Sequence, residues 1–298
     1  MLSRGLKAKT MIAKQKSSGN SQLVVLLMSS VPVSQGDTPQ SVIEQLTTAL
    51  RRKSPRPSGP VAQLEPFLVA RNVVDLDLRP GLQCDGYLQA RGRSYPEGFR
   101  MVVKQDTCAE RVRFTIAHEL CHTFFYEFVP EIKFRVHPTD NQEETLCNLG
   151  AASFLMPARG LRSRADKMAV SLESLYALAE EYGVSFPSMF LRLRSLGIWK
   201  GELSLWRRLC DGTFDLQRLY GGRKISWRWL DNSIPSSAWN DNRVVTGNSF
   251  VECNNRQGSR CFEPVWYQLA RRGEMLVGLW GSLTPRIRQR DLPLFDAA

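Results

Sequence analysis

Residues 114–122 read FTIAHELCH, an apolar stretch that contains two histidines four positions apart. In a helix, positions i and i+4 lie one turn apart on the same face, so His118 and His122 can both bind a single metal ion. Glu119 follows the first histidine directly, where its carboxylate can take a proton from water. The stretch therefore predicts a helix that carries an H-E-x-x-H metal site, a pattern typical of metal-dependent hydrolysis.

The apolar pattern around this motif predicts a helix over residues 109–128. At 100° per residue, one arc of this helix collects apolar side chains, namely Phe114, Ala117, Cys121, Phe124, Phe125 and Phe128. The arc beside it holds His118, Glu119, His122 and Tyr126. We therefore expect the helix to pack one side into a core and to present the metal-binding side to a cleft.

A second helix is predicted between Pro138 and Pro157, with the dipeptide Met156-Pro157 ending it. Asp140 followed by Glu143 matches a capping box, in which Asp140 is the N-cap and Glu143 reaches back to the backbone at the helix start. Glu144 then faces another side of the helix, together with Asn148 one turn later.

A catalytic zinc ion needs three protein ligands, so one ligand remains to be found besides the two histidines. The candidates are His137 and the acids after it. We predict Glu144 as the third ligand, with Glu143 as the runner-up, and we expect Asn148 to orient one of the ligating histidines. The alternative is that these acids are solvated charges at a helix start, which the helix dipole favours. Tyr126 and His137 are candidates for stabilising the transition state.

The net charge of +11 is concentrated near the N-terminus. Residues 1–60 hold nine Lys and Arg against two acids, which is +7 and leaves +4 for the remaining chain. We predict residues 1–60 as a disordered basic tail and linker, with a short helix at 41–52 and the linker SPRPSGP at 54–60. Such a tail can contact nucleic acid directly, but we do not expect this to be the main function.

The seven cysteines are odd in number and form no C-x-x-C pair, so neither a disulfide framework nor a zinc ribbon is indicated. Cys253 and Cys261 flank a turn-rich segment and are interpreted as ordinary strand residues that face each other across a hairpin. The apolar run at 23–28 is too short to span a bilayer. We therefore predict a reduced, cytoplasmic protein with no membrane partner.

Strands are predicted on both sides of the motif region. Residues 84–91 and 99–104 form a hairpin around the turn at 94–98, and we expect strand 99–104 to bind an extended substrate by edge pairing. In the C-terminal part, short strands are predicted at 225–230, 244–251, 265–269 and 275–279. Residues 200–298 are therefore predicted as a β-rich domain that could serve regulation.

Two helices are predicted at 171–182 and 185–196, broken at Gly183, with Ser185 as an N-cap. The break resembles the turn of a helix-turn-helix unit. The second helix carries Met, Phe and Leu where a recognition helix carries polar residues, so packing against the protease-like core is favoured over DNA contact.

Two sequence blocks, FTIAHEL-x-H at 114–122 and E-x-x-x-N-x-x-A-A-x-x-L-M-P at 144–157, resemble the ImmA/IrrE family of metallopeptidases. The resemblance covers about residues 60–200 and implies a zincin-like (gluzincin) fold. It implies His118, His122 and Glu144 as metal ligands and Glu119 as the base. It also implies helix-turn-helix repressors as substrates. Cys121 and Cys147 depart from the family pattern by replacing smaller residues, and both are small enough for a close helix contact.

We therefore expect an α+β protein with an ImmA/IrrE-like metallopeptidase domain at 61–199, which includes the helical pair, followed by the domain at 200–298. Its expected function is that of an endopeptidase that cleaves a protein partner, a DNA-binding repressor, through metal-activated water with Glu119 as general base. Zinc is the expected ion, and manganese suits the same ligands. The alternative is a regulatory or DNA-binding protein in which the protease-like domain is an interaction scaffold.

Overall fold

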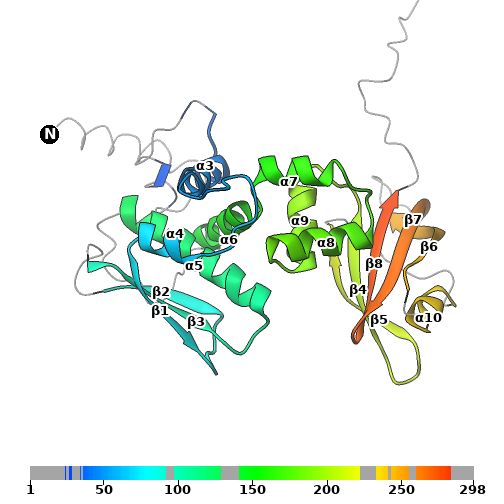
Figure 1. Cartoon of the computed structure of the whole chain (residues 1–298). Coiled ribbons are helices and arrows are strands. Elements are labelled where there is room, and N and C mark those ends of the chain that lie inside the picture. Colours follow the sequence, from blue (N-terminus) through cyan, green and yellow to red (C-terminus); the bar gives the residue numbers. More distant parts are fainter. Residues whose placement is uncertain are drawn as a thin grey trace, which may run out of the picture. The chain divides into compact units, whose positions relative to one another are not determined.

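The chain, seen here as a computed structural model, forms two compact units (Figure 1). Unit 1 runs to Lys167 and includes Leu178–Ser188, whereas unit 2 comprises Met168–Ala177 and the chain from Met189 onward. The elements confirm a mixed α+β fold with helices in the central region and a C-terminal sheet. The residues that the structure describes are 24, 27, 28, 34, 36–91, 97–128, 141–221, 233–240, 243–254 and 260–282.

Unit 1 contains a three-stranded sheet built from β1 (Val73–Arg79), β2 (Gly86–Ala90) and β3 (Phe99–Lys104). The predicted hairpin of β2 and β3 is confirmed as an antiparallel pair, and β1 joins β3 from the other side in parallel. The order is β1-β3-β2, so β3 is the central strand and its prediction as a substrate-binding edge is wrong. The hairpin pattern revealed only one neighbour of β3, and β1 fills its second side.

Among the described residues before Lys167, the helices beside this sheet are α3 (Pro39–Arg51), α4 (Glu65–Ala70), α5 (Ala109–Phe128), α6 (Asn141–Leu155) and α7 (Ala158–Ala165). The range of α5 is the predicted one. It packs on β2 and β3, α6 packs on α5, and α3 packs on α6 (Figure 1). The predicted N-cap Asp140 lies outside the described residues.

The buried face of α5 follows the predicted apolar arc. Ala117, Cys121, Phe124 and Phe125 are buried, which fixes the helix against the sheet on one side and α6 on the other. Phe114, predicted in the same arc, instead lines a cleft. Phe114 lies nearly two helical turns before Cys121, toward the start of α5, where this helix borders the cleft.

Residues 39–60, predicted as part of a tail and linker, belong to the packed structure of unit 1. Val42, Ile43 and Leu50 of α3 are buried. The Arg51 guanidinium is 1% exposed and donates hydrogen bonds to the backbone carbonyls of Pro57, Arg56, Gly59 and Phe154. In sequence, the basic residues at 51–56 resemble a solvated linker. In the structure, Arg51 connects the loop at 56–59 to the end of α6 through these hydrogen bonds.

The crossing of α5 and α6 depends on the absence of a side chain at Gly150. A Cβ atom at this position would lie 2.7 Å from Cys121 Sγ and 3.6 Å from Ile43 Cγ1 of α3. Contacts of 2.7 Å are closer than real Cβ atoms tolerate, so either the helices separate or the sulfur moves. Gly150 therefore sets the distance between the helix that carries the histidines and the helix that carries Glu144.

Gly150→Ala is expected to destabilise the wild-type protein by about 1–3 kcal/mol through overpacking, although alanine is the better helix former. In a Cys121→Ala background the clash partner is gone, and the same change should stabilise by about 0.5–1 kcal/mol. Urea unfolding of the four proteins in this double-mutant cycle measures both values. Equal effects in the two backgrounds would contradict the proposed close contact.

Unit 2 is built on a five-stranded antiparallel sheet with the order β5-β4-β8-β7-β6. Its strands are β4 (Glu202–Arg208), β5 (Phe214–Tyr220), β6 (Val245–Asn254), β7 (Arg260–Arg272) and β8 (Met275–Ser282). The helix α10 (Ser233–Asn240) packs on β7 and β8, where Trp239 joins a core with Trp206 and Trp280. The indole N–H groups of Trp206 and Trp280 donate to Ser204 Oγ, at 2.9 and 2.7 Å, so these two buried donors are satisfied.

Strand predictions in unit 2 are confirmed for β6, β7 and β8, and Cys253 pairs with Cys261 in the predicted hairpin register. The predicted strand at 225–230 lies outside the described residues. Strands β4 and β5 were not predicted.

The predicted helix pair is present as α8 (Leu172–Tyr182) and α9 (Phe186–Ser195), joined at Gly183 with φ +61°. Gln268 Oε1 of β7 accepts from the Leu172 N–H at 2.7 Å, and the Arg272 guanidinium lies over the Tyr176 ring at 4.4 Å. The start of α8 thus packs on the C-terminal sheet. At the other end of α8, a Cβ at Gly183 would lie 3.1 Å from Arg113 Nε of α5. Packing of the second helix on the metallopeptidase-like core stays a prediction. Met189, Phe190 and Leu193 of α9 are buried, so packing uses these side chains.

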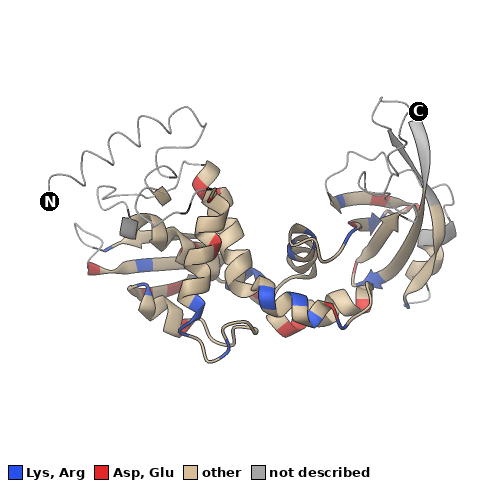
Figure 2. Ribbon diagram, turned by 90° about the horizontal axis from the view of Figure 1, so that it is seen from above, with Lys and Arg blue, Asp and Glu red and all other residues tan. Residues whose placement is uncertain are grey.

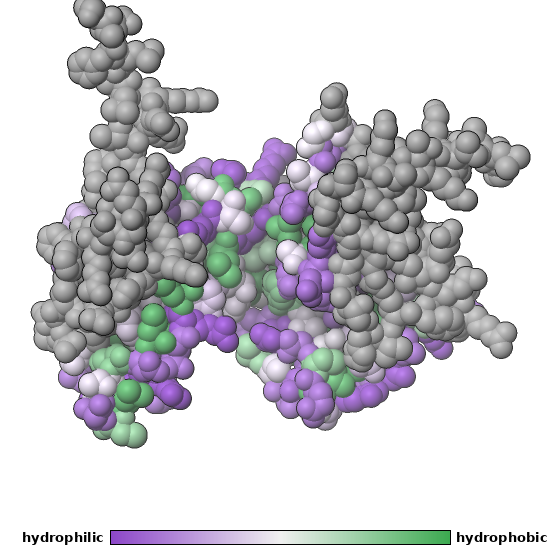
Figure 3. Space-filling view, turned by 180° about the vertical axis from the view of Figure 1, so that it is seen from behind, coloured by the Kyte–Doolittle hydropathy of each residue, from purple (hydrophilic) through white to green (hydrophobic). Residues whose placement is uncertain are grey.

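No helix among the described residues has the length and apolarity to cross a bilayer. On the face shown in Figure 3, hydrophobic side chains occur in small groups among hydrophilic ones. The large apolar side chains that are exposed are Val69, Val74, Leu78, Val170, Leu191 and Leu209.

Candidate metal centre

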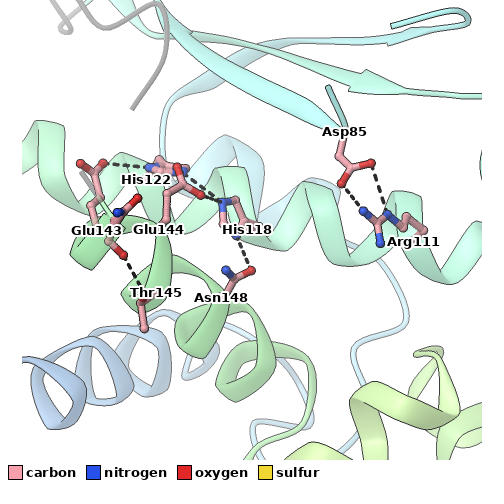
Figure 4. A network of polar contacts seen from close by, with 9 residues as sticks. Asp85, Arg111, His118, His122, Glu143, Glu144, Thr145 and Asn148 are labelled. Atoms are coloured by element: carbon pink, nitrogen blue, oxygen red, sulfur yellow. Dashed lines mark hydrogen bonds and ion pairs between the residues drawn. The ribbon is translucent and has the colours of Figure 1, made fainter. Parts of the chain in front are cut away.

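Three donor groups from two helices converge in unit 1 (Figure 4). The Nε2 atoms of His118 and His122, one turn apart on α5, are 3.1 Å from each other. Glu144 extends from α6 so that Oε2 lies 3.2 Å from His118 Nε2 and Oε1 lies 3.5 Å from His122 Nε2. The two imidazoles hold the pKa of the Glu144 carboxyl well below its usual range, chiefly through the contact with His118.

The spacing of these donors fits a zinc ion. With Zn–N and Zn–O bonds of about 2.0–2.1 Å in a tetrahedron, ligand atoms lie about 3.3 Å apart. The three observed separations of 3.1, 3.2 and 3.5 Å bracket that value. Three converging donors with a cleft beside them leave a fourth position open to solvent, as a catalytic site requires.

The second nitrogen of each imidazole is held by a residue of α6. Asn148 Oδ1 lies 3.1 Å from His118 Nδ1, the contact expected of it, and Glu143 Oε1 lies 2.8 Å from His122 Nδ1. Glu143 is 1% exposed, so it is not a solvated charge. Its predicted capping partner Asp140 lies outside the described residues, so the capping box stays a prediction. These contacts fix the rings with Nε2 toward the ligand position and increase the basicity of the histidines.

A second group of metal-binding residue types, formed by His122, Glu143 and Cys147, surrounds the other side of the His122 ring. Cys147 is fully buried, and burial raises the pKa of its thiol. A neutral thiol is a poor ligand, and a site with all three members buried gives no access to substrate. We therefore assign this group to orienting His122.

Glu119 is a second carboxylate near the two histidines, and with them it forms a group that could itself hold a metal ion. Its carboxylate is within 4.8 Å of the nearest ligand atoms of both histidines, and the side chain lines the cleft. Burial raises the pKa of this carboxyl, which makes Glu119 a better proton acceptor when ionised, whereas the nearby histidines oppose the shift. This combination suits a general base.

A cleft of about 690 Å³ runs from the donor triad along the N-terminal half of α5. Its walls include β2, the start of α5 and the start of α9, and its lining residues include Asp85, Gly86, Tyr87, Arg111, Phe114, Thr115, Ser185 and Ser188. Asp85 and Arg111, which both line the cleft, form an ion pair (Figure 4). The volume is ample for a peptide side chain and backbone segment.

Gly86 allows the edge strand β2 to approach the catalytic helix. A Cβ there would lie 2.7 Å from Thr115 Cγ2 and 3.5 Å from Glu119 Cγ. Neither Gly86 nor Thr115 was identified from the sequence, although a glycine inside a strand pattern signals a close backbone approach.

Of the two predicted transition-state stabilisers, Tyr126 is absent from the described residues that line the cleft. Tyr126 is 4% exposed and packs edge-on against Phe99 with ring centroids 5.2 Å apart, so it belongs to the core. His137 lies outside the described residues. The roles predicted for Glu119, His118, His122 and Glu144 remain predictions. Glu119, His118 and Glu144 line the cleft, and His122 lies next to them, with its Nε2 3.1 Å from His118 Nε2.

Residues 89–194 match the model of the peptidase M78 family, described as the IrrE N-terminal-like domain. This chain contains an IrrE N-terminal-like domain. The matched span holds the H-E-x-x-H helix, the Glu144 helix and the α8–α9 pair, so the sequence resemblance to this family is confirmed.

A similar protein is the radiation response metalloprotease IrrE of Deinococcus deserti, which is 33% identical over 112 residues. The match covers 31% of this chain and 40% of that relative, so much of the relative's length has no counterpart here. Among solved structures, a Mycobacterium tuberculosis transcriptional regulator gives a TM-score of 0.49 at 15% identity, covering 80% of this chain and 76% of that one. The IrrE-like domain is therefore assigned on sequence, and its metal centre on the geometry above.

Proposed function

We propose that this protein is a zincin-like, zinc-dependent endopeptidase that cleaves a protein partner. The observation that carries the proposal is the convergence of His118, His122 and Glu144 to within 3.1–3.5 Å at one end of an open cleft, with Glu119 beside them. When bound, zinc supplies a Lewis acid that polarises the peptide carbonyl and promotes loss of a proton from water. The substrate we propose is a DNA-binding repressor, as the family resemblance implies.

The chain's own residues provide the remaining chemistry. Glu119 takes the proton from the attacking water and returns it to the leaving amine of the cleaved peptide bond. Asn148 and Glu143 keep both imidazoles in the ligating orientation. These roles require that the two histidines stay neutral and that Glu144 stays ionised, and the low pKa of Glu144 favours the latter.

The free edge of β2 is the segment that we propose to bind the substrate backbone. Asp85 accepts from the Lys104 N–H and Arg91 donates to the Gly98 carbonyl, so alternate residues of β2 pair with β3. The backbone groups of Gly86, Leu88 and Ala90 then point to the free edge. An extended peptide added there would run past Glu119, because Gly86 contacts that side chain.

Zinc titration of the metal-free protein tests the site. Wild type should bind one zinc per chain, and Glu144→Ala should bind at least about 100-fold more weakly because a direct ligand is lost. Glu143→Gln should weaken binding by about 10–100-fold, the range for residues that hold a ligand in place. Competition with a chromophoric chelator measures each affinity.

Glu110→Ala is the matched control, since Glu110 is an exposed acid of α5 that lines the same cleft and is absent from the donor contacts. Its zinc affinity should equal that of wild type. A wild-type protein that binds no zinc, or a Glu144→Ala variant that binds as tightly as wild type, would refute the metal centre and favour the scaffold alternative.

A further inference from the structure

Unit 1 carries a cluster of exposed basic side chains away from the cleft residues. Arg52, Lys53 and Arg56 follow α3 in a loop, and Arg159 lies on the first turn of α7. All four side chains are exposed, and none has a hydrogen bond or ion pair within the described part of the chain. We call these four residues the basic surface.

The loop and α7 are held together by backbone contacts. A Cβ at Gly160 would overlap the Ser58 carbonyl oxygen at 1.5 Å, so the loop backbone lies directly on this turn of α7. The buried Arg51 binds the carbonyls of Arg56 and Gly59 and anchors the other side of the loop. The cations at Arg56 and Arg159 therefore occupy defined neighbouring positions, unlike charges on a flexible tail.

No acidic residue interrupts the two segments that form the basic surface. The sequence has none between Glu44 and Glu65 and none between Glu144 and Asp166. On α7, Arg164 pairs with Glu181 at 2.8 Å, and Arg162 adds a further positive charge. Figure 2 shows positions of both signs, blue for Lys and Arg and red for Asp and Glu, on the helices of the protein. Like charges on one surface repel one another, so a polyanion that neutralises them binds favourably.

The neighbouring side chains select among polyanions. Segments 52–60 and 157–167 contain no aromatic residue on which the bases of a single strand could stack. The exposed large apolar residues of the described chain all lie outside these segments, so nothing is present to insert into a membrane. A surface of arginine and lysine alone suits the phosphate backbone of a duplex.

We propose that the basic surface formed by Arg52, Lys53, Arg56 and Arg159 binds the phosphate backbone of duplex DNA without reading its sequence. The contact is independent of the metal centre and does not rest on the proposed peptidase activity. It would hold the protein on the polymer to which DNA-binding proteins are themselves attached, which raises the rate of encounter with them.

Fluorescence anisotropy with a labelled 20-base-pair duplex, repeated over a range of salt concentrations, tests the proposal. The variant Arg56→Gln/Arg159→Gln removes two phosphate contacts, so the slope of log K against log[salt] should become shallower by about 1.8. Affinity at 0.1 M salt should fall about tenfold or more. The matched control is Lys200→Gln/Arg218→Gln, which removes the same charge from exposed positions of unit 2 and should retain the wild-type slope.

Three results would overturn the proposal. The first is no duplex binding by wild type at 50 mM salt. The second is an equal change of slope in both double variants, which would assign binding to net charge and not to this surface. The third is binding to phosphatidylserine vesicles, without duplex binding, that is lost in Arg56→Gln/Arg159→Gln alone. Both double variants should unfold at the same temperature as wild type. A difference in DNA binding between them then reflects the loss of phosphate contacts and not a loss of folding.

Discussion

Glu119→Gln is expected to lower the rate of peptide cleavage by about 10²–10⁴-fold, the contribution of a positioned general base. Glutamine has nearly the shape of glutamate and can keep hydrogen bonds in the cleft, but its amide cannot accept the proton of the attacking water. The donors nearest to one another are His118, His122 and Glu144, at 3.1–3.5 Å, whereas the Glu119 carboxylate lies within 4.8 Å of the histidine ligand atoms, so we expect zinc affinity to change little. The variant thus separates proton transfer from metal binding.

The measurement uses zinc-loaded protein and a peptide library made by digesting a whole proteome, with new termini identified by mass spectrometry. Glu110→Gln serves as the control because it removes a cleft acid from the same helix at a position away from the donors. It should cleave at a rate near that of wild type. Equal cleavage by wild type and Glu119→Gln would remove Glu119 from the mechanism. Zinc binding without any cleavage, of the library or of intact repressors, would favour the scaffold alternative.

Arg51→Ala is expected to destabilise unit 1 by about 3–4 kcal/mol, because buried carbonyls lose their donor at about 1–3 kcal/mol each. Arg51 holds three loop carbonyls and the Phe154 carbonyl at the end of α6, and its guanidinium lies 5.8 Å from the centre of the Phe154 ring. Burial lowers the pKa of Arg51 to about 10, which still leaves it charged at neutral pH. One side chain thus satisfies carbonyls that water does not reach.

Urea unfolding followed by circular dichroism measures this effect. Arg52→Ala is the matched control, since the neighbouring arginine is exposed and its loss should change the unfolding free energy by no more than about 0.5 kcal/mol. The unfolding free energy of Arg51→Lys should lie between those of the two alanine variants, because lysine keeps the charge but lacks the planar guanidinium with its several N–H donors. Equal stability of the two alanine variants would show that water or other donors satisfy these carbonyls.

The sequence was sufficient to predict those elements and site residues that follow from a regular residue pattern or spacing. The 3.6-residue pattern around His118 defined α5 to both ends, and the one-turn spacing of Glu144 and Asn148 placed both toward the histidines. The C-terminal strands β6, β7 and β8 were recognised because β-branched and aromatic residues cluster between turn residues.

Other features depend on contacts that are distant in sequence. Glu143 has the pattern of a capping residue, and only the α5–α6 crossing shows that its oxygen binds His122 Nδ1. The partner of β3 in β1 lies more than twenty residues earlier in the chain, so the hairpin alone suggested a free edge. Arg51 belongs to a run of charges, and its burial follows from carbonyls more than a hundred residues away.

The packing of α3 on α6, where Ile43 lies close to Gly150, should couple folding to metal occupancy if the site binds zinc as proposed. Through it, α3 supports the helix crossing that brings Glu144 to the histidines. A ligand that binds only the native state adds RT ln(1 + [L]/Kd) to stability, which is about 2.7 kcal/mol at a hundredfold excess of zinc over Kd. By this thermodynamic linkage, zinc should restore much of the stability lost on damage to α3. A fragment beginning at Val61 should in turn require far more zinc to reach the same occupancy.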